Sequence, residues 1–374
     1  MNTVSNGLAR RINDFLRPAC MIAAMAVVTA NAGVAEVKAE VLSSTFPATF
    51  DPYPTTLPAR SAVTVSSGRT VLYSTSGPAG GAPVLLLHGT LSSAASADLF
   101  AHYRTASDAL NLRFIVPERT GYGDTPYDPT MTALDYTDDW HDLLAALGYS
   151  QVKIVAISGS GVYADHFVTR YPSSVEQLHL LSGVNTAMTF SACPASTPYD
   201  YRGLGQIFID NPPMFLFLFT PPDVDVFMSI PGAIGWQAMH NADVGDPINN
   251  SDIGLSHDFY LYCNSPVTDF SMATFPTFIY HGELDPLVPI SDAELHEAQY
   301  PNVAAFRRYP NGGHQASLRH LGQVLLDVAG HHEKTILCHN GANLIIDDSA
   351  EAAHLAHGDT LDICAWSGTP AEGQ

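Results

Sequence analysis

The segment VAISGSGVYA (residues 155–164) contains two serines, and its surroundings decide how the rest of the chain is interpreted. It overlaps VKIVAIS (152–158), a continuous apolar run typical of a strand that is covered on both faces. Residues 161–171 then have the pattern of a helix that ends before Pro172. A sharp turn from a buried strand into a helix can hold a nucleophilic side chain at its apex. The alternative is a Gly/Ser turn without chemistry.

The two serines of this segment are not equivalent as candidates for that apex. Side chains two residues before and two residues after the apex nearly collide, so both positions must be small. Around Ser158 these positions hold Ala156 and Ser160, whereas Ser160 has Val162, a bulky β-branched residue, two positions ahead. Steric reasoning therefore favours Ser158 as the nucleophile.

Strands and helices alternate along most of the chain. Helical patterns follow near 93–110 and at 131–147, the second ending at Gly148. Further strands are predicted at residues 61–67, 70–76, 83–89, 112–118, 175–183, 276–282 and 304–310. This rhythm predicts an α/β fold with a mostly parallel sheet and helices on both sides.

The alternation stops between residues 184 and 272. This stretch contains two proline pairs and the apolar run MFLFLFT (214–220). We expect a cap or lid over the carboxyl edge of the sheet, where such folds bind ligands. The alternative is an irregular core segment without a special function.

The composition of this cap suggests what it covers. Phe215, Phe217 and Trp236 are the candidates for an apolar pocket wall, although plain core packing is the competing interpretation. Arg202 is the only Lys or Arg residue of the segment, so an anionic substrate is disfavoured and a neutral one is favoured.

A nucleophilic serine needs a base and a group that orients the base. Asp285, in HGELDPLVP (281–289), and His314, in NGGHQ (311–315), follow successive predicted strands. They therefore lie at the same sheet edge as Ser158, in the chain order Ser, Asp, His. Glu283 is an alternative to Asp285, but Asp285 lies later in its loop and fits better.

An oxyanion hole requires two backbone N–H groups close to the serine. One donor is expected from Gly159, the residue after the nucleophile, and the other from Thr90, in the loop that follows LLLHG (85–89). Gly89 would let the backbone approach closely.

Five motifs in this order resemble the α/β-hydrolase fold family over about residues 60–330. They are LLLHG, PERTGYGDTP (117–126), AISGSGVYA (156–164), HGELDPLVP and NGGHQ. The resemblance implies Ser158 as nucleophile, Asp285 as orienting acid, His314 as base, and Thr90 and Gly159 as oxyanion donors. Ala156 and Ser160 replace the glycines usual at the elbow, but both are small.

The N-terminus has the pattern of an export signal. Arg10, Arg11 and Arg17 precede and flank an apolar run (19–30), and Ala30-Asn31-Ala32 offers a cleavage site. We therefore expect a signal peptide over 1–32 and a secreted or periplasmic protein without a stable membrane anchor, with the export route, Sec or twin-arginine, left open.

The remaining boundaries follow from composition and alternation. A lead-in segment is predicted over 33–58, the hydrolase core over 59–183 and 273–330, and a C-terminal module over 331–374. The formal net charge of −21 argues against nucleic acid and anionic membranes as partners. It leaves the oligomeric state open.

Four cysteines follow the predicted signal peptide, and an even number in an exported chain suggests two disulfides. Of the three possible pairings, Cys193–Cys263 and Cys338–Cys364 are favoured because each lies within its own segment.

The C-terminal module begins with CHNG (338–341) and ends with AHLAHGDTL (353–361), and it resembles a small module of secreted bacterial proteins. Zinc ligation by its cysteines and by His339, His354 and His357 is an alternative to the disulfide Cys338–Cys364, which is the simpler interpretation outside the cytoplasm.

A serine nucleophile suits attack on a carbonyl carbon and requires neither a metal nor an organic cofactor. We expect a hydrolase that acts on a neutral, largely apolar carbonyl compound, either a small molecule or a polymer. A carboxylic ester is the favoured substrate. One alternative is carbon–carbon hydrolysis of a β-diketone, because enzymes that hydrolyse oxidised polyvinyl alcohol have a similar layout. A second is a non-catalytic binding protein on a hydrolase scaffold.

Overall fold

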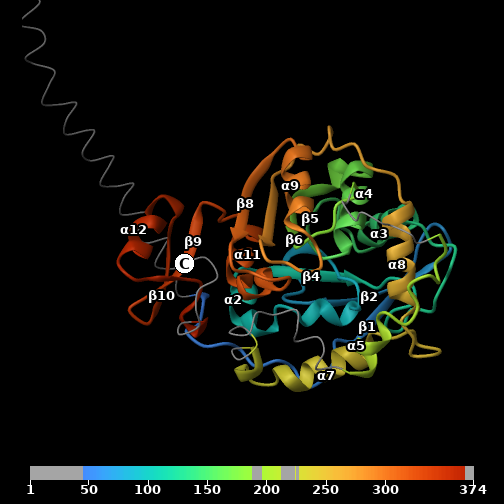
Figure 1. Ribbon diagram of the computed structural model, residues 1–374, viewed down its shortest axis with the longest axis horizontal. Coiled ribbons are helices and arrows are strands. Elements are labelled where there is room, and N and C mark those ends of the chain that lie inside the picture. The colour runs from blue at the N-terminus through green and yellow to red at the C-terminus, as the bar shows by residue number, and fades with distance from the viewer. Residues whose placement is uncertain (1–44, 188–195, 212–223, 225–226, 367–374) are drawn as a thin grey trace, which may run out of the picture.

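An eight-stranded sheet forms the centre of the molecule (Figure 1). A computed structural model describes residues 45–187, 196–211, 224 and 227–366, and orders the strands β1-β2-β4-β3-β5-β6-β7-β8. The strands are β1 (Arg60–Thr64), β2 (Thr70–Ser76), β3 (Ala82–Leu87), β4 (Leu112–Pro117), β5 (Val152–Ile157), β6 (Val175–Leu181), β7 (Thr277–Gly282) and β8 (Val303–Tyr309). The pairings β1–β2 and β2–β4 are antiparallel, and the other neighbouring strands of this sheet pair parallel. The predicted, mostly parallel sheet is confirmed.

Helices cover both faces of this sheet, because the parallel strands are apolar on both sides. In β3, Leu85 and Leu87 belong to the core beneath α3 (Ala133–Ala146) and α4 (Ser160–Arg170). The alternate residues, Val84 and Leu86, belong to the core on the opposite face. That second core also includes apolar residues of α2 (Arg104–Ala109), α10 (Ala316–Arg319) and α11 (Leu321–Val328), whereas α9 (Ile290–Gln299) contributes to the first.

The helical stretch predicted near 93–110 is broken into three short pieces. They are the 3₁₀ turns η1 (Ala94–Asp98) and η2 (Ala101–Tyr103), followed by α2. The backbones of Phe100 and Tyr103 leave the helical conformation while both rings are buried. Burial of these aromatic rings thus replaces helical continuity here.

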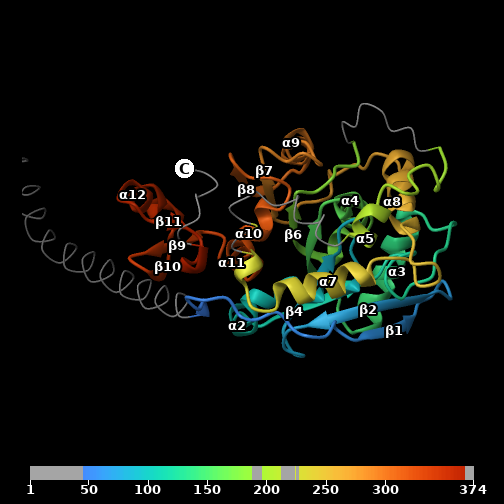
Figure 2. The same ribbon diagram turned by 60° about the horizontal axis from the view of Figure 1, so that its bottom comes forward.

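In the segment between β6 and β7, the residues that the structure describes form helices and no strand. It contains α5 (Gln206–Asp210), α7 (Ala233–Asp243) and α8 (Ile253–Asn264), which Figure 2 shows near one another at one side of the molecule. The predicted pocket residues Phe215 and Phe217 lie outside the described residues.

The C-terminal module forms a second, small sheet. Strand β9 (Lys334–His339) lies between β10 (Ala342–Asp347) and β11 (Thr360–Leu361), and all pairings are antiparallel. The helix α12 (Glu351–Ala356) connects β10 to β11. In Figures 1 and 2 the module lies at the opposite end of the molecule from α8.

One predicted disulfide is confirmed within this module, where Cys338 and Cys364 are bonded with their Cα atoms 4.7 Å apart. Cys263, in α8, is also disulfide-bonded. Its predicted partner, Cys193, lies outside the described residues.

The lead-in segment links the module to the cap helices. The side-chain amide of Asn343 donates to the carbonyl oxygens of Phe46 and Pro47, at 3.0 and 2.8 Å. Further along, the backbone N–H of Tyr53 donates to Pro231 O at 2.8 Å. The predicted signal peptide, 1–32, lies outside the described residues, and no helix within the described part is long and apolar enough to span a bilayer.

Candidate active site

Ser158 occupies a sharp turn between β5 and α4. Its φ is +54°, a left-handed conformation that is rare for a residue other than glycine. The neighbouring backbone is crowded, because a Cβ atom added at Gly159 would lie 1.9 Å from the hydroxyl oxygen of Tyr262. A Cβ at Gly161 would lie 2.4 Å from Val184 O. The turn thus has the geometry that a nucleophile elbow requires.

Ser160 is fully buried and serves the turn itself. Its Oγ lies 2.8 Å from both Leu87 O and Ile157 O, and it accepts a hydrogen bond from Ile157 N at 2.7 Å. Ser158 remains partly accessible. The steric preference for Ser158 over Ser160 thus agrees with the geometry.

The structure brings the three predicted side chains together. His314 Nε2 lies 3.0 Å from Ser158 Oγ, and His314 Nδ1 lies 2.7 Å from Asp285 Oδ2. The residues are widely separated in sequence but sit after β5, β7 and β8, whose carboxyl ends meet at one edge of the sheet. The rival acid, Glu283, instead pairs with Arg308 at 3.0 Å.

The carboxylate of Asp285 is held by several donors. Besides His314, the backbone N–H groups of Leu287 and Val288 donate to Oδ1, at 2.8 and 2.9 Å. Burial alone would raise the pKa of Asp285, but these hydrogen bonds and the nearby imidazole outweigh it and lower the pKa below the usual value. An ionised Asp285 fixes the proton of His314 on Nδ1 and leaves the Nε2 lone pair facing Ser158.

Thr90 and Gly159, the predicted oxyanion donors, lie beside the serine. No described residue accepts a hydrogen bond from either backbone N–H group, so both are available to a ligand. Thr90 Oγ1 lies 2.6 Å from the hydroxyl of Tyr262, which comes from α8. Sequence reasoning missed Tyr262, because no local motif marks a contact between residues so far apart.

A buried arginine fixes the loop that carries Thr90. Arg119, from PERTGYGDTP, donates to the carbonyl oxygens of His88 and Gly89 and pairs with Asp258 of α8 at 2.8 Å. The hydroxyls of Tyr122 and Tyr163 also donate to Asp258, at 2.8 and 2.6 Å. The charges of the pair are therefore compensated inside the protein.

His88 completes this support. Its Nε2 accepts from Arg119 N at 3.2 Å, and its Nδ1 lies 3.0 Å from Gly89 O. Burial, together with the charge of Arg119, lowers the pKa of His88 well below its usual value. His88 is thus a neutral, structural group. Two features of the sequence indicated that these residues hold the loop of Thr90. His88 directly precedes Gly89, and Arg119 follows a neighbouring strand.

A pocket of about 570 Å³ opens onto Ser158 and His314. Its wall is mostly apolar and is contributed largely by the cap segment, including Leu204, Phe208, Phe227, Trp236, Leu255 and Phe259. Trp236 was predicted to line such a pocket, and it does. Tyr53 of the lead-in also lines it and stacks on Trp236 with the ring centroids 4.8 Å apart, a contribution that the sequence did not suggest.

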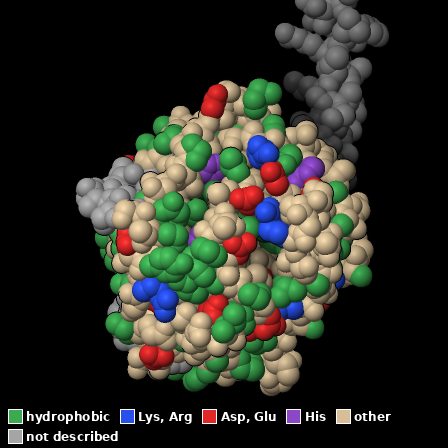
Figure 3. Space-filling model, turned by 90° about the vertical axis from the view of Figure 1, so that its right-hand side faces the viewer, with side chains coloured by type: hydrophobic (Ala, Val, Ile, Leu, Met, Phe, Trp, Pro, Cys, Tyr) green, Lys and Arg blue, Asp and Glu red, His purple; other side chains and the backbone are tan. Residues whose placement is uncertain are grey.

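The outer surface of the cap segment is also partly apolar. Figure 3 views the molecule from the right-hand side of Figure 1, where α8 lies, and shows hydrophobic side chains gathered on that face. The large exposed apolar side chains among the described residues of this segment are Tyr199, Leu204, Ile207, Met228, Ile234, Ile248, Val267 and Met272.

Solved structures with the same architecture span most of the chain. An α/β-hydrolase fold protein from Nakamurella multipartita is 20% identical, with a TM-score of 0.57, and the match covers 73% of this chain and 100% of that one. An esterase from Thermogutta terrifontis is 18% identical, with a TM-score of 0.55, and the match covers 73% of this chain and 97% of that one. An enol-lactonase from Burkholderia xenovorans LB400 is 12% identical, with a TM-score of 0.56, and the match covers 73% of this chain and 99% of that one.

The chain therefore has the α/β-hydrolase fold, as the sequence motifs predicted. No protein-family model matches the sequence, and no curated protein matches it. The narrower resemblance to enzymes that hydrolyse oxidised polyvinyl alcohol stays a prediction.

Proposed function

We propose that this protein is a serine hydrolase that attacks the carbonyl carbon of a neutral, largely apolar carboxylic ester. The observation that carries the proposal is the position of His314, within hydrogen-bonding distance of both Ser158 Oγ and Asp285 Oδ2. A base that is oriented by a carboxylate and lies next to a serine on a left-handed turn is the arrangement that nucleophilic catalysis needs.

The reaction would proceed through an acyl-enzyme. His314 Nε2 takes the proton of Ser158 as Oγ attacks the carbonyl carbon, and Asp285 stabilises the imidazolium that forms. The N–H groups of Thr90 and Gly159 donate to the oxyanion. His314 then passes the proton to the leaving alcohol, and a water molecule releases the acid by the same route.

The pocket supports the substrate class. Its volume suits a small molecule or one end of a polymer, and its apolar wall favours acyl or alkyl groups without charge. The structural neighbours include an esterase from Thermogutta terrifontis and an enol-lactonase from Burkholderia xenovorans LB400. This agrees with an ester as the substrate.

We also propose that the protein is exported. The basic and apolar pattern of residues 10–32 supports this location, and so does the disulfide Cys338–Cys364, since disulfides persist mainly outside the cytoplasm.

A panel of p-nitrophenyl esters tests the activity and the substrate class together. We expect hydrolysis of neutral acetate, butyrate and octanoate esters, and at least about tenfold slower hydrolysis of a hemisuccinate ester, whose negative charge would be desolvated in the apolar pocket. Ser158→Ala should lower kcat by about a thousandfold or more.

The same protein, incubated with an acyclic β-diketone, tests the carbon–carbon alternative. Formation of a carboxylate and a ketone faster than ester cleavage would replace the ester proposal. A folded protein that hydrolyses neither class would support the binding-protein alternative.

A further inference from the structure

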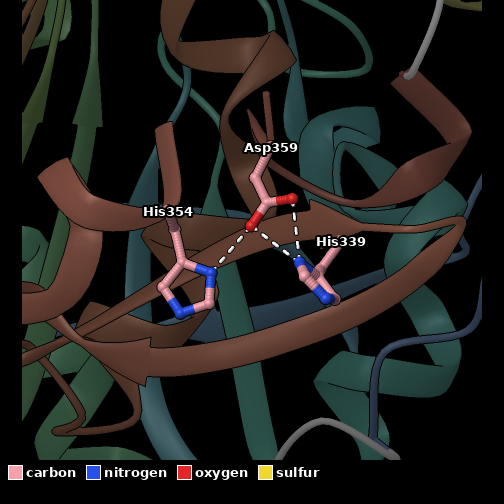
Figure 4. A group of neighbouring side chains, drawn as sticks. All are labelled: His339, His354 and Asp359. Atoms are coloured by element: carbon pink, nitrogen blue, oxygen red, sulfur yellow. Dashed lines mark hydrogen bonds and ion pairs between the residues drawn. The ribbon is translucent and has the colours of Figure 1, made fainter. Parts of the chain in front are cut away.

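Four potential metal ligands gather in the C-terminal module, away from the pocket. His339 ends β9, His354 lies in α12, His357 follows that helix, and Asp359 directly precedes β11. Figure 4 shows the imidazoles of His339 and His354 directed toward the carboxylate of Asp359 from two sides. Nothing in the proposed hydrolysis uses these residues.

The donor atoms lie close to one another. His339 Nδ1 is 2.9 and 2.8 Å from the two carboxylate oxygens of Asp359, and His354 Nδ1 is 2.7 Å from Oδ2. His357 Nδ1 lies 3.8 Å from the same oxygen, beyond hydrogen-bonding distance. Asp359 is 5% exposed, whereas the histidines are accessible from outside. The cluster thus has a buried anionic base and an open, nitrogen-rich rim.

The backbone sets this arrangement. Because Thr360 pairs with Cys338 across β11 and β9, Asp359 and His339 lie side by side at the next position of the ladder. A tight turn after α12, with Gly358 at φ +101°, carries the chain from His357 to Asp359. The disulfide beside His339 ties both ends of the segment together. The ligands are therefore largely positioned without an ion.

The donor set indicates which ion would fit. Three imidazole nitrogens and one carboxylate are a set that suits Zn²⁺, whereas Ca²⁺ and Mg²⁺ prefer oxygen ligands alone. The cysteines considered as ligands from the sequence are excluded, because Cys338 and Cys364 form a disulfide. Asp359, which the sequence did not single out, takes their place.

The distances require a small adjustment of His339, His354 and Asp359 and a larger one of His357. Four ligands about 2.1 Å from a tetrahedral zinc ion lie about 3.4 Å from one another. The ligand atoms of His339, His354 and Asp359 all lie within 4.8 Å of one another, and their contacts of 2.7–2.9 Å must open by about half an ångström. His357 lies outside this group of three, with Nδ1 3.8 Å from the carboxylate, and its imidazole must turn toward the other two histidines to complete the set. Rotations of accessible imidazole side chains can supply such shifts.

A neighbouring amide can support the ion-bound form. Asn340 Nδ2 lies 2.9 Å from His339 Nε2, so the amide nitrogen donates there when His339 carries its proton on Nδ1. When zinc binds His339 Nδ1, the imidazole carries its proton on Nε2. The side-chain amide of Asn340 can then turn by 180° so that its oxygen accepts a hydrogen bond from this Nε2–H group.

From this geometry we propose that His339, His354, His357 and Asp359 form a zinc site that holds the C-terminal module together. All four positions of the tetrahedron come from the protein, as in structural rather than catalytic zinc sites. The competing explanation is a set of histidine–aspartate hydrogen bonds that binds no ion.

Calorimetric titration of the full, chelator-treated chain with ZnCl₂ at pH 7.5 separates the two explanations. We expect one zinc ion per chain and an increase in the melting temperature with zinc. His354→Gln keeps an N–H group for Asp359 but loses the imidazole, so it should weaken zinc binding at least about tenfold. Asp359→Asn should do the same.

His332→Gln, at an exposed histidine outside the cluster, is the matched control and should bind zinc as the unaltered protein does. If Asp359→Asn does not fold, the exposed His357→Gln provides the second test. Absence of stoichiometric binding, or equal binding by the His354→Gln protein and the unaltered protein, would overturn the proposal. Calcium chloride in place of zinc should give no binding.

Discussion

The two serines of the 155–164 segment have different roles in the turn. Ser158 has the left-handed backbone and faces His314, whereas Ser160 is buried and bonds to the carbonyl oxygens of Leu87 and Ile157. A single segment thus contains a candidate nucleophile and the side chain that braces it.

This division predicts opposite effects of two alanine exchanges. Ser160→Ala leaves buried backbone groups without a partner, so we expect a loss of about 1–3 kcal/mol in the free energy of unfolding, with ester hydrolysis largely retained. Ser158→Ala should instead abolish ester hydrolysis and leave the free energy of unfolding largely unchanged. Urea unfolding and ester assays on both proteins measure this, and loss of activity only in Ser160→Ala would contradict it.

Much of the site could be predicted from sequence because one rule joins its parts. Ser158, Asp285 and His314 each follow a strand of a parallel sheet, and the carboxyl ends of such strands share one edge. Tyr262 and Asp258 follow no strand. Their role depends on the packing of α8 against the core, which a single sequence does not specify.

At the element scale, α8 is fastened to the core by the buried pair of Asp258 and Arg119. The same arginine donates to the carbonyl oxygens of His88 and Gly89, so α8 and the loop that carries Thr90 share one support. An unpaired charge at this depth is costly.

Asp258→Asn should therefore destabilise the protein by about 3–5 kcal/mol, because Arg119 would remain buried without its counter-charge. Asp138→Asn is the matched control, since Asp138 pairs with Arg170 on the surface and its loss should cost about 1 kcal/mol or less. Chemical denaturation of both variants provides the comparison. Equal, small effects would show that the buried pair does not support α8.

The elements themselves were predicted unevenly. Strands such as β3 and β5 are continuous apolar runs, so their positions follow from hydrophobicity alone. The stretch near 93–110 has helical composition, but the buried rings of Phe100 and Tyr103 break it into short turns. Tertiary packing overrides local propensity there.

At the scale of the whole molecule, the core holds histidines that burial keeps neutral. Burial lowers the pKa of His102 to about 3 and that of His240 to about 4, from a usual value of 6.5. At pH values between these lowered pKa values and 6.5, the unfolded chain therefore binds more protons than the folded chain. Stability must rise with pH across this window and fall as acid is added.

We expect the free energy of unfolding to decrease as the pH falls from 6.5 to 5, with each such histidine contributing up to about 1.4 kcal/mol per pH unit. His102→Gln removes one of these groups. Unfolding of this variant should therefore take up as much as one proton fewer, and its free energy of unfolding should change less steeply with pH. Denaturation at a series of pH values measures both slopes. Identical slopes would mean that His102 does not contribute.

The lead-in joins the ends of the molecule. Phe50 lies 5.2 Å from Trp366 of the C-terminal module, between ring centroids, while Tyr53 contacts Trp236 of the cap. Its composition, rich in Ala, Pro, Ser and Thr, gave no sign of this bridging role. Only the aromatic residues within it were a signal, and Trp236 and Trp366 lie far from them in the sequence.

Fluorophosphonate labelling of the full chain shows whether Ser158 is an activated nucleophile. Fragment-ion mass spectrometry of the labelled peptide can distinguish Ser158 from Ser160. We expect a label on Ser158 in the unaltered protein and in Ser160→Ala, and none in Ser158→Ala. A label on Ser160, or an unlabelled Ser158 in a folded protein, would contradict it.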